Sequence, residues 1–453
     1  MTNTPESALA INRSERPHES GRGLLASGAG LVLIKLLNAF LGFATVMVFA
    51  RLLPPEDYGV YVLMLTVAQF LALPLQMGIP ILLVREISVA QAQSRPAMIM
   101  GVRAWTRKVV LVGTLVVGTF VIGSYAVVVA AGWPILSEFS WPLVLLIVGL
   151  MPVIAEMKRV MGILNGYRKP AQSRLPDGLI RPVLLLLIGG VGLWANWFSA
   201  TGLLAVYLVT ALLAALGGWA LVRRAEASHP SYQGQAEFNT EYWWQSLGPL
   251  TMFAAASTIK TYSDVLMLGA MDTTETVAFY RVASQIAGLA LLAQIAANVV
   301  LGPRIAALNA NEEHDRMQGL AVRGSRIALA ATIVFACLLV LMGRSGMVFL
   351  LGEEYAPVYA LAVLLSFGMV ATSAFGGTSM LLNMTNREKS SSRYAVSTAI
   401  GNIALNLLFI PFFGALGAAF ATILTNVIMQ VLSWRRLVRD LGMRTDAFAG
   451  IHS

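Results

Sequence analysis

Long apolar runs constrain this chain more than any other feature of its sequence. Runs of about 20 residues follow one another from residue 24 to residue 434, separated by short polar segments. A transmembrane helix needs about 20 consecutive apolar residues to cross the hydrocarbon core of a bilayer. Charged residues make up only 12% of the chain, against about a quarter in a soluble domain. The runs therefore predict an all-α integral membrane protein and exclude a soluble enzyme or a disordered protein.

We expect about 12 transmembrane helices in two series of six, separated by a polar stretch. The first series covers 24–50, 59–83, 109–131, 142–162, 178–196 and 202–222, and the second covers 246–270, 277–300, 327–343, 357–382, 395–412 and 415–434. The predicted organisation is a flexible cytoplasmic tail (1–22), a six-helix lobe (23–222), a cytoplasmic linker (223–245), a second six-helix lobe (246–435) and a cytoplasmic tail (436–453). Residues 1–22 lack the apolar core of a signal peptide, so we expect no cleavage there.

The distribution of charge predicts the orientation. When the spans alternate and the N-terminus is placed in the cytoplasm, most of the 32 lysines and arginines fall in cytoplasmic segments. Basic residues collect in cytoplasmic loops of membrane proteins. We therefore expect both termini in the cytoplasm of a bacterial inner membrane. The formal net charge of +9 then reports orientation and does not indicate nucleic-acid binding.

Catalytic and metal-binding clusters are not indicated. Cys337 is the single cysteine, and the four histidines lie far apart in polar segments at His18, His229, His314 and His452. We therefore expect no metal, no cofactor and no enzyme activity, with H⁺ or Na⁺ as candidate coupling ions for transport.

The two series of spans resemble each other at a nearly constant offset. Glu56 and Tyr61 match Glu275 and Tyr280 at 219 residues, and Arg85 matches Arg304 at the same spacing. Six spans per half is an even number, so both halves would enter the membrane from the same side. Parallel repeats of this kind form two-lobed transporters that bind their cargo between the lobes. We therefore expect two parallel-repeat lobes around a central lumen.

Charges inside the spans are the candidate site residues, because ionisable groups in a membrane usually mark a pathway. Lys35 shares one helical face of the first span with Asn38 and Thr45, a face that would suit a water-filled lumen. The alternative is a lysine that extends its ammonium to the membrane interface.

Three further charges lie in the second series of spans. Lys260 and Asp264 are four residues apart and can pair on one helical face; they are either a structural pair or a functional one. Arg281 shares a face with Gln285 and lies either in the lumen or at the outer interface. Because the charges are mostly positive, and guanidinium groups bind phosphate well, we expect an anionic cargo. Second-rank candidates are Arg51, Arg85 and Arg304.

Residues 49–87, FARLLPPEDYGVYVLMLTVAQFLALPLQMGIPILLVREI, resemble the first helical hairpin of the polysaccharide transporter family, which includes the Wzx-type O-antigen flippases. The similarity lies in the pattern A-R-x-L-x-P-x-D-Y-G-x-Y and the apolar span that ends in Arg85-Glu86. The turn in LLGEEYAPVYALAVLL, at 350–365, also resembles the family. This family belongs to the superfamily of the lipid II flippase MurJ and the MATE multidrug exporters, and the resemblance extends over about 24–434.

This resemblance implies a function. Members of the family move undecaprenyl-pyrophosphate-linked oligosaccharides from the cytoplasmic to the periplasmic leaflet by alternating access, for O-antigen, capsule or exopolysaccharide assembly. The implied partners are a lipid-linked anionic glycan, membrane lipids and other polysaccharide-assembly membrane proteins. By position, Lys35, Lys260 and Arg281 match the lumen cations of the family.

Two other functions remain open. A MATE-like cation-coupled drug exporter usually has a carboxylate in its first span, where this chain has Lys35 and Asn38; Asp264 keeps this alternative open. A membrane glycan polymerase or ligase would carry a large outer loop, and all predicted outer loops are short.

Overall fold

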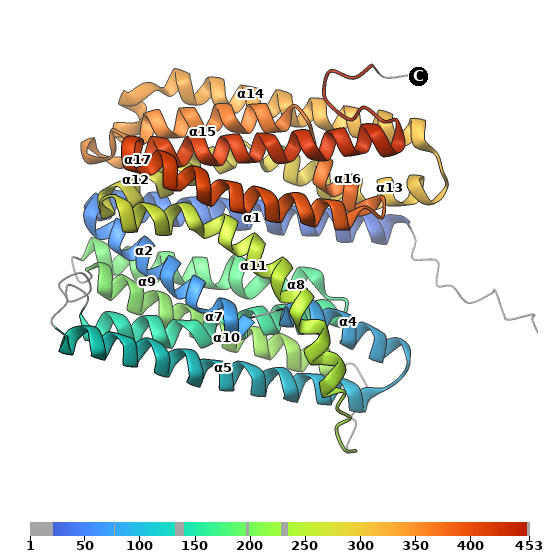
Figure 1. Cartoon of the computed structure of the whole chain (residues 1–453), viewed down its shortest axis with the longest axis horizontal. Helices are drawn as coiled ribbons and strands as arrows, with labels where there is room; N and C mark the ends of the chain where they lie inside the picture. The colour runs from blue at the N-terminus through green and yellow to red at the C-terminus, as the bar shows by residue number, and fades with distance from the viewer. Residues whose placement is uncertain (1–20, 77, 132–139, 196–198, 228–233, 451–453) are drawn as a thin grey trace, which may run out of the picture.

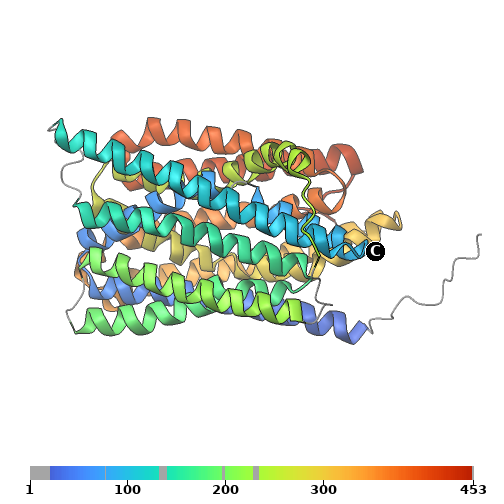
Figure 2. The same ribbon diagram turned by 90° about the horizontal axis from the view of Figure 1, so that it is seen from below.

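The computed structural model describes residues 21–76, 78–131, 140–195, 199–227 and 234–450. Its helices lie roughly parallel to the long axis of the molecule (Figures 1 and 2). No strand occurs in these ranges. A bilayer favours such a structure, because a helix satisfies all its backbone hydrogen bonds within one segment. The all-α membrane fold is therefore confirmed.

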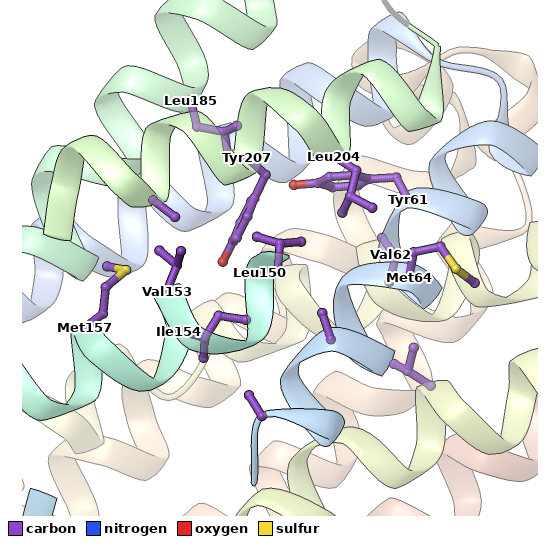
Figure 3. Close-up of a cluster of buried hydrophobic side chains, with 14 of the residues drawn as sticks. Tyr61, Val62, Met64, Leu150, Val153, Ile154, Met157, Leu185, Leu204 and Tyr207 are labelled. Atoms are coloured by element: carbon purple, nitrogen blue, oxygen red, sulfur yellow. The ribbon is translucent and has the colours of Figure 1, made fainter. Parts of the chain in front are cut away.

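The N-terminal lobe consists of the helices that precede residue 228. In chain order they are α1 (Gly21–Leu52), α2 (Pro55–Leu71), α3 (Leu73–Gln76), α4 (Ile79–Ala92), α5 (Pro96–Ala130), α7 (Trp141–Gly166), α8 (Pro170–Leu175), the π-helix η1 (Pro176–Ile180), α9 (Arg181–Trp194) and α10 (Ala200–Ala227). Its core contains aliphatic, methionine and tyrosine side chains from α2, α7, α9 and α10 (Figure 3). Leu150, Leu204, Tyr61 and Tyr207 are buried there.

The C-terminal lobe contains the remaining helices. They are α11 (Thr240–Met271), α12 (Thr274–Leu289), α13 (Leu292–Ala310), α14 (His314–Leu351), the short 3₁₀ helix η2 (Glu353–Tyr355), α15 (Val358–Ser373), α16 (Thr378–Met384) and α17 (Glu388–Leu441). Figure 1 shows α13–α17 on one side of the molecule and α5, α7 and α10 on the other.

Helix α17 consists of two helices that reverse direction at Gly414. A straight helix of 54 residues would be about 81 Å long, far longer than a bilayer is thick. Gly414 has φ 53° and ψ −131°, a conformation that favours glycine. The two halves lie side by side, since Asn402 donates to Thr422 across the hairpin at 3.3 Å (Figure 1). The break lies between the predicted spans 395–412 and 415–434.

Eight helices of the described part are long and apolar enough to cross a membrane, or nine if the bent pair α12–α13 forms one span. The protein is thus a multi-pass membrane protein, and the count of twelve stays a prediction.

The helix bounds repeat along the chain with an offset of 219 residues. Adding 219 to the bounds of α1 (21 and 52) gives those of α11 (240 and 271). Adding it to the start of α2 (55) gives the start of α12 (274).

Two predicted boundaries differ from the helices. Helix α10 continues to Ala227 and α11 begins at Thr240, so helical structure takes up both ends of the predicted linker 223–245. Residues 1–20 of the predicted tail lie outside the described residues.

The described part of the C-terminal tail is docked on the C-terminal lobe. Met443, Thr445 and Ala449 are buried. Arg326 of α14 donates to the carbonyl oxygens of Ala447 and Ala449 at 3.0 and 2.9 Å. These bonds hold residues 443–449 against the lobe.

Candidate functional site

The two lobes meet most closely where α2 lies beside α12 and α11. A Cβ atom added to Gly59 of α2 would lie 2.5 Å from the carbonyl carbon of Thr274, at the start of α12. A Cβ on Gly269 of α11 would lie 2.8 Å from Cδ2 of Leu63. Only glycine permits helices to approach this closely. These contacts join the lobes at the end of α2 that we predict to be outer.

The loop after α14 adds to the outer contact. Tyr355 donates to the carbonyl oxygen of Leu53 at 3.3 Å, and its ring packs edge-on against Phe279 at 5.9 Å. Burial raises the pKa of the Tyr355 phenol well above its usual range, so the hydroxyl stays protonated and can donate. The bond connects the C-terminal lobe to the end of α1.

A second contact between the lobes lies where α4 meets the first half of α11. A Cβ on Gly78 would lie 2.9 Å from the carbonyl carbon of Leu250, and the Gly78 amide donates to Oγ1 of Thr251 at 3.1 Å. Gly59 and Gly78 are 19 residues apart in the chain. At about 1.5 Å per helical residue, this separation corresponds to about 30 Å along the helix axis. The lobes therefore touch at both ends of the α2–α3 segment.

Polar side chains reinforce this inner contact. Arg85 donates to Ser246 at 2.9 Å and lies over the ring of Tyr242 at 5.1 Å. Glu86 binds Arg85 at 3.0 Å and accepts a bond from the indole of Trp243 at 3.2 Å. The resemblance had singled out Arg85-Glu86, and the structure places this pair against α11.

Lys35 and Asn38 lie on α1 beside the segment that precedes α9. Lys35 is half-buried, and Arg174 of α8 is close enough for the two positive charges to interact. Asn38 packs against Gly178 of η1, where a Cβ would lie 3.1 Å from its Cγ. Neither Lys35 nor Arg174 forms an ion pair with any carboxylate that the structure describes. Two unneutralised cations therefore lie side by side here.

Arg281 of α12 faces the N-terminal lobe. Its charge acts on the phenols of Tyr58 and Tyr61 of α2, and Gln285, one turn further, lies 3.6 Å from the position of a Cβ on Gly42 of α1. No described carboxylate forms an ion pair with Arg281 either. Its position favours the lobe interface.

Asp264 is held inside the C-terminal lobe by three donors. Tyr280 of α12 and Thr422 of α17 donate to Oδ2 at 2.5 and 2.6 Å, and Nδ2 of Asn406 donates to Oδ1 at 2.6 Å. The aspartate is 6% exposed. Hydrogen bonds of this kind stabilise a buried carboxylate that lacks a cationic partner.

A second ring of oxygens surrounds this carboxylate. Ser263 donates to Oδ1 of Asn402 at 3.0 Å, and Asn406 lies 3.2 Å from the same oxygen. Oδ1 of Asn406 is buried with no hydrogen-bond partner. The Asp264 cluster, as we call Ser263, Asp264, Tyr280, Asn402, Asn406 and Thr422, is thus rich in oxygen acceptors.

The structure does not form the predicted ion pair between Lys260 and Asp264. Nζ of Lys260 lies 3.4 Å from the sulfur of Met429, whereas Asp264 binds the three donors described above. The i, i+4 spacing places both residues on one side of α11, where their charges still interact, but the hydrogen-bond donors of α12 and α17 bind the carboxylate directly.

The second-rank arginines lie apart from one another. Arg51 is exposed at the end of α1, near Gly352 of the loop after α14. Arg304 is exposed on α13. Arg85 belongs to the inner contact, so the structure does not gather these three into one site.

Four residues of the cluster were not predicted from the sequence as site residues: Asn402, Asn406, Thr422 and Tyr280. One signal was available: two asparagines four residues apart within an otherwise apolar run. Among the described residues, no group of three or more His, Cys, Asp or Glu side chains could hold a metal ion. The Asp264 cluster offers one carboxylate, which suits a proton or a monovalent cation better than a transition metal.

Comparison with known proteins decides the family. The sequence model of the polysaccharide biosynthesis protein family matches residues 24–309, which is 286 of the 453 residues. The chain belongs to this family. The probable flippase AglR of Haloferax volcanii is 29% identical to this polysaccharide biosynthesis protein over 199 residues. That alignment covers 43% of this chain and 41% of the relative, so it spans less than half of AglR.

Solved structures share the fold of this polysaccharide biosynthesis protein. An inward-facing MATE multidrug resistance transporter of the MOP superfamily has a TM-score of 0.67 at 13% identity, covering 90% of this chain and 97% of its own. The inward closed conformation of the lipid II flippase MurJ has a TM-score of 0.62 at 14% identity, covering 89% and 86%. The predicted MATE/MurJ-like fold is confirmed.

Proposed function

We propose that this protein is a flippase for lipid-linked oligosaccharides. Its cargo would be an undecaprenyl-pyrophosphate-linked unit that crosses from the cytoplasmic to the periplasmic leaflet for O-antigen, capsule or exopolysaccharide assembly. Membership of the polysaccharide biosynthesis family carries the proposal, and the name of the relative AglR supports it. The protein would act in a bacterial inner membrane with both termini in the cytoplasm.

Three cations without a described carboxylate partner support an anionic cargo. Lys35, Arg174 and Arg281 are free of ion pairs with described residues, and a pyrophosphate group would supply the missing negative charge. Lys35 and Arg174 belong to the N-terminal lobe and Arg281 to the C-terminal lobe. An anionic cargo that passes between the lobes would therefore meet positive charge from both lobes.

Alternating access would use the two contacts between the lobes. The outer contact at Gly59 and the inner contact at Gly78 lie about 30 Å apart. Opening one while the other holds would expose the interface to one side of the membrane at a time. The lipid tail would remain in the bilayer while the glycan passes between the lobes.

We assign the coupling of transport to the Asp264 cluster. A proton or Na⁺ on Asp264 would neutralise the buried carboxylate, and Oδ1 of Asn406 has no other partner. Asp264 is bonded to α12 and to α17, so its occupancy would change how these helices pack.

The test uses purified protein in liposomes with a fluorescent undecaprenyl-pyrophosphate oligosaccharide. Flipping should require the protein, and Lys35→Ala should reduce the rate at least about tenfold, since one charge-assisted hydrogen bond contributes about 1.5–3 kcal/mol. Lys389→Ala is the matched control, because Lys389 is an exposed lysine at the start of α17. Wild-type protein that fails to move the lipid under an imposed H⁺ or Na⁺ gradient would refute the proposal.

The drug-exporter alternative has one observation in its favour, the buried carboxylate of Asp264. It predicts efflux of cationic dyes from liposomes, coupled to the same gradient. Dye efflux without flipping would favour this function. A glycan polymerase or ligase would instead extend or transfer the oligosaccharide in the same assay.

A further inference from the structure

A cavity of about 810 Å³ opens between α5, α7 and α10. These helices lie on the side of the N-terminal lobe away from α14–α17 (Figure 1). Neither Lys35 nor Arg281 lines this cavity, which is therefore separate from the candidate site described above. Its volume falls in the range of small-molecule sites.

Four arginines and two glutamates line the cavity, and the glutamates neutralise two of the arginines. Arg159 donates to both oxygens of Glu156 at 2.8 and 2.7 Å. Arg103 forms an ion pair with Glu226. The indole of Trp219 also donates to Glu156 at 2.7 Å, and the ring lies against Arg159 at 4.9 Å. This network forms a rigid polar wall.

Two arginines of the cavity remain without a carboxylate. Arg107 of α5 and Arg223 of α10 are exposed. Among the residues that the structure describes, neither has an ion pair or a hydrogen-bond partner. The cavity therefore has a net charge of +2, and both free guanidinium groups can donate to an incoming anion.

The other end of the cavity is aliphatic and exposed. Leu111 is one turn beyond Arg107 on α5, while Leu212 and Leu216 lie on α10 two to three turns before Arg223; their exposed fractions are 53%, 45% and 65%. At 1.5 Å per residue, the apolar part begins about 6–10 Å from the arginines. In a membrane protein such exposed leucines face acyl chains.

We propose that this cavity binds one anionic phospholipid of the surrounding bilayer. Arg107 and Arg223 bind the head-group phosphate, and the leucines contact the first part of an acyl chain. The predicted orientation places the arginines at the cytoplasmic side, where basic pockets between transmembrane helices bind anionic head groups. A soluble phosphate would use only the polar half of this cavity, whereas a lipid fills both halves.

The test measures lipid binding by native mass spectrometry of the full-length protein in detergent. Dioleoyl-phosphatidylglycerol is the anionic probe, and dioleoyl-phosphatidylethanolamine is the probe with no net charge. We expect one retained phosphatidylglycerol. The variant Arg107→Ala/Arg223→Ala should bind it about 30-fold more weakly, which corresponds to about 2 kcal/mol for two cations.

The matched control is Lys108→Ala/Arg224→Ala. These residues follow Arg107 and Arg223 directly, are exposed, and do not line the cavity, so the double variant removes the same charge from the same helices. It should bind phosphatidylglycerol like the wild type. Unchanged thermal unfolding of both variants shows that each is folded.

Three results would overturn the proposal. If both double variants lose the same affinity for phosphatidylglycerol, the lipid is attracted by overall positive charge and not bound by Arg107 and Arg223. If the wild-type protein retains phosphatidylethanolamine as well as phosphatidylglycerol, the cavity does not require an anionic lipid. Displacement of phosphatidylglycerol by millimolar inorganic phosphate would make the cavity an anion site without a role for the acyl chain.

Discussion

Substitution of Gly59 by alanine should weaken the outer contact between the lobes. The added Cβ would overlap the carbonyl oxygen of Thr274 and lie 2.5 Å from its carbonyl carbon, whereas carbon atoms pack at about 3.5–4.0 Å. The carbon contact alone requires the start of α12 to move away by about 1.0–1.5 Å, and the overlap with the oxygen requires more. Alanine is well tolerated by the helical backbone of α2, so the steric contact alone is changed.

The free-energy cost follows from overpacking. Inserting a methyl group into a tightly packed contact costs about 1–3 kcal/mol. In the alternating-access cycle proposed above, only the outer-closed state would contain this contact, so the ratio of outer-open to outer-closed protein should rise about 5- to 150-fold. Folding should be little affected, since the open state relieves the clash.

Spin-label distances can measure this shift. Glu56 and Glu275 are exposed on α2 and α12, and the single cysteine, Cys337, can be replaced by serine. Labels at 56 and 275 should show a larger fraction of long distances in Gly59→Ala than in the parent protein. Gly288→Ala is the control on α12, because nothing lies within 4 Å of its added Cβ. If both variants give the parent distribution, the contact does not control opening and the reasoning is wrong.

Three further predictions follow from other contacts. Gly78→Ala should open the inner contact instead, leaving the 56–275 distance unchanged and increasing the labelling of a cysteine at Ser246 by a water-soluble reagent. Asp264→Asn should reduce gradient-driven flipping at least about tenfold and abolish its dependence on pH or Na⁺, measured in liposomes; a variant that keeps this dependence would rule out Asp264 as the coupling residue. Arg326→Ala removes two charge-assisted hydrogen bonds of about 1.5–3 kcal/mol each, so residues 443–449 should be cleaved faster in limited proteolysis than in Arg326→Lys.

The sequence predicted the membrane class and the repeat because both depend on local composition and on spacing. An apolar run of about 20 residues can satisfy its backbone only as a helix in a bilayer. The offset of 219 appeared in matched residues such as Tyr61 and Tyr280 and recurs in the bounds of α1 and α11. The reversal at Gly414 was also predicted, because it lies in the gap between the predicted spans 395–412 and 415–434.

The partners of individual charges could not be predicted in this way. Spacing along one helix suggested that Lys260 and Asp264 pair, but the donors to Asp264 come from residues 16, 142 and 158 positions away. Which face of α11 meets α12 and α17 depends on packing between helices, and a single sequence does not reveal it. The same reason explains why the cavity with Arg107 and Arg223, on two helices distant in the chain, was missed.

Tyr61 and Tyr280 occupy equivalent positions of a duplicated scaffold, yet their surroundings have diverged. Tyr280 donates to the buried Asp264. Tyr61 instead packs against the rings of Phe49 and Tyr58 and lies among aliphatic side chains of the core such as Leu204 (Figure 3). In the N-terminal lobe the residue 219 positions before Asp264 is Thr45, which bonds only to its own helix. If Asp264 couples transport as proposed above, ion binding would change the packing of the C-terminal lobe alone, and the N-terminal lobe would move only in response.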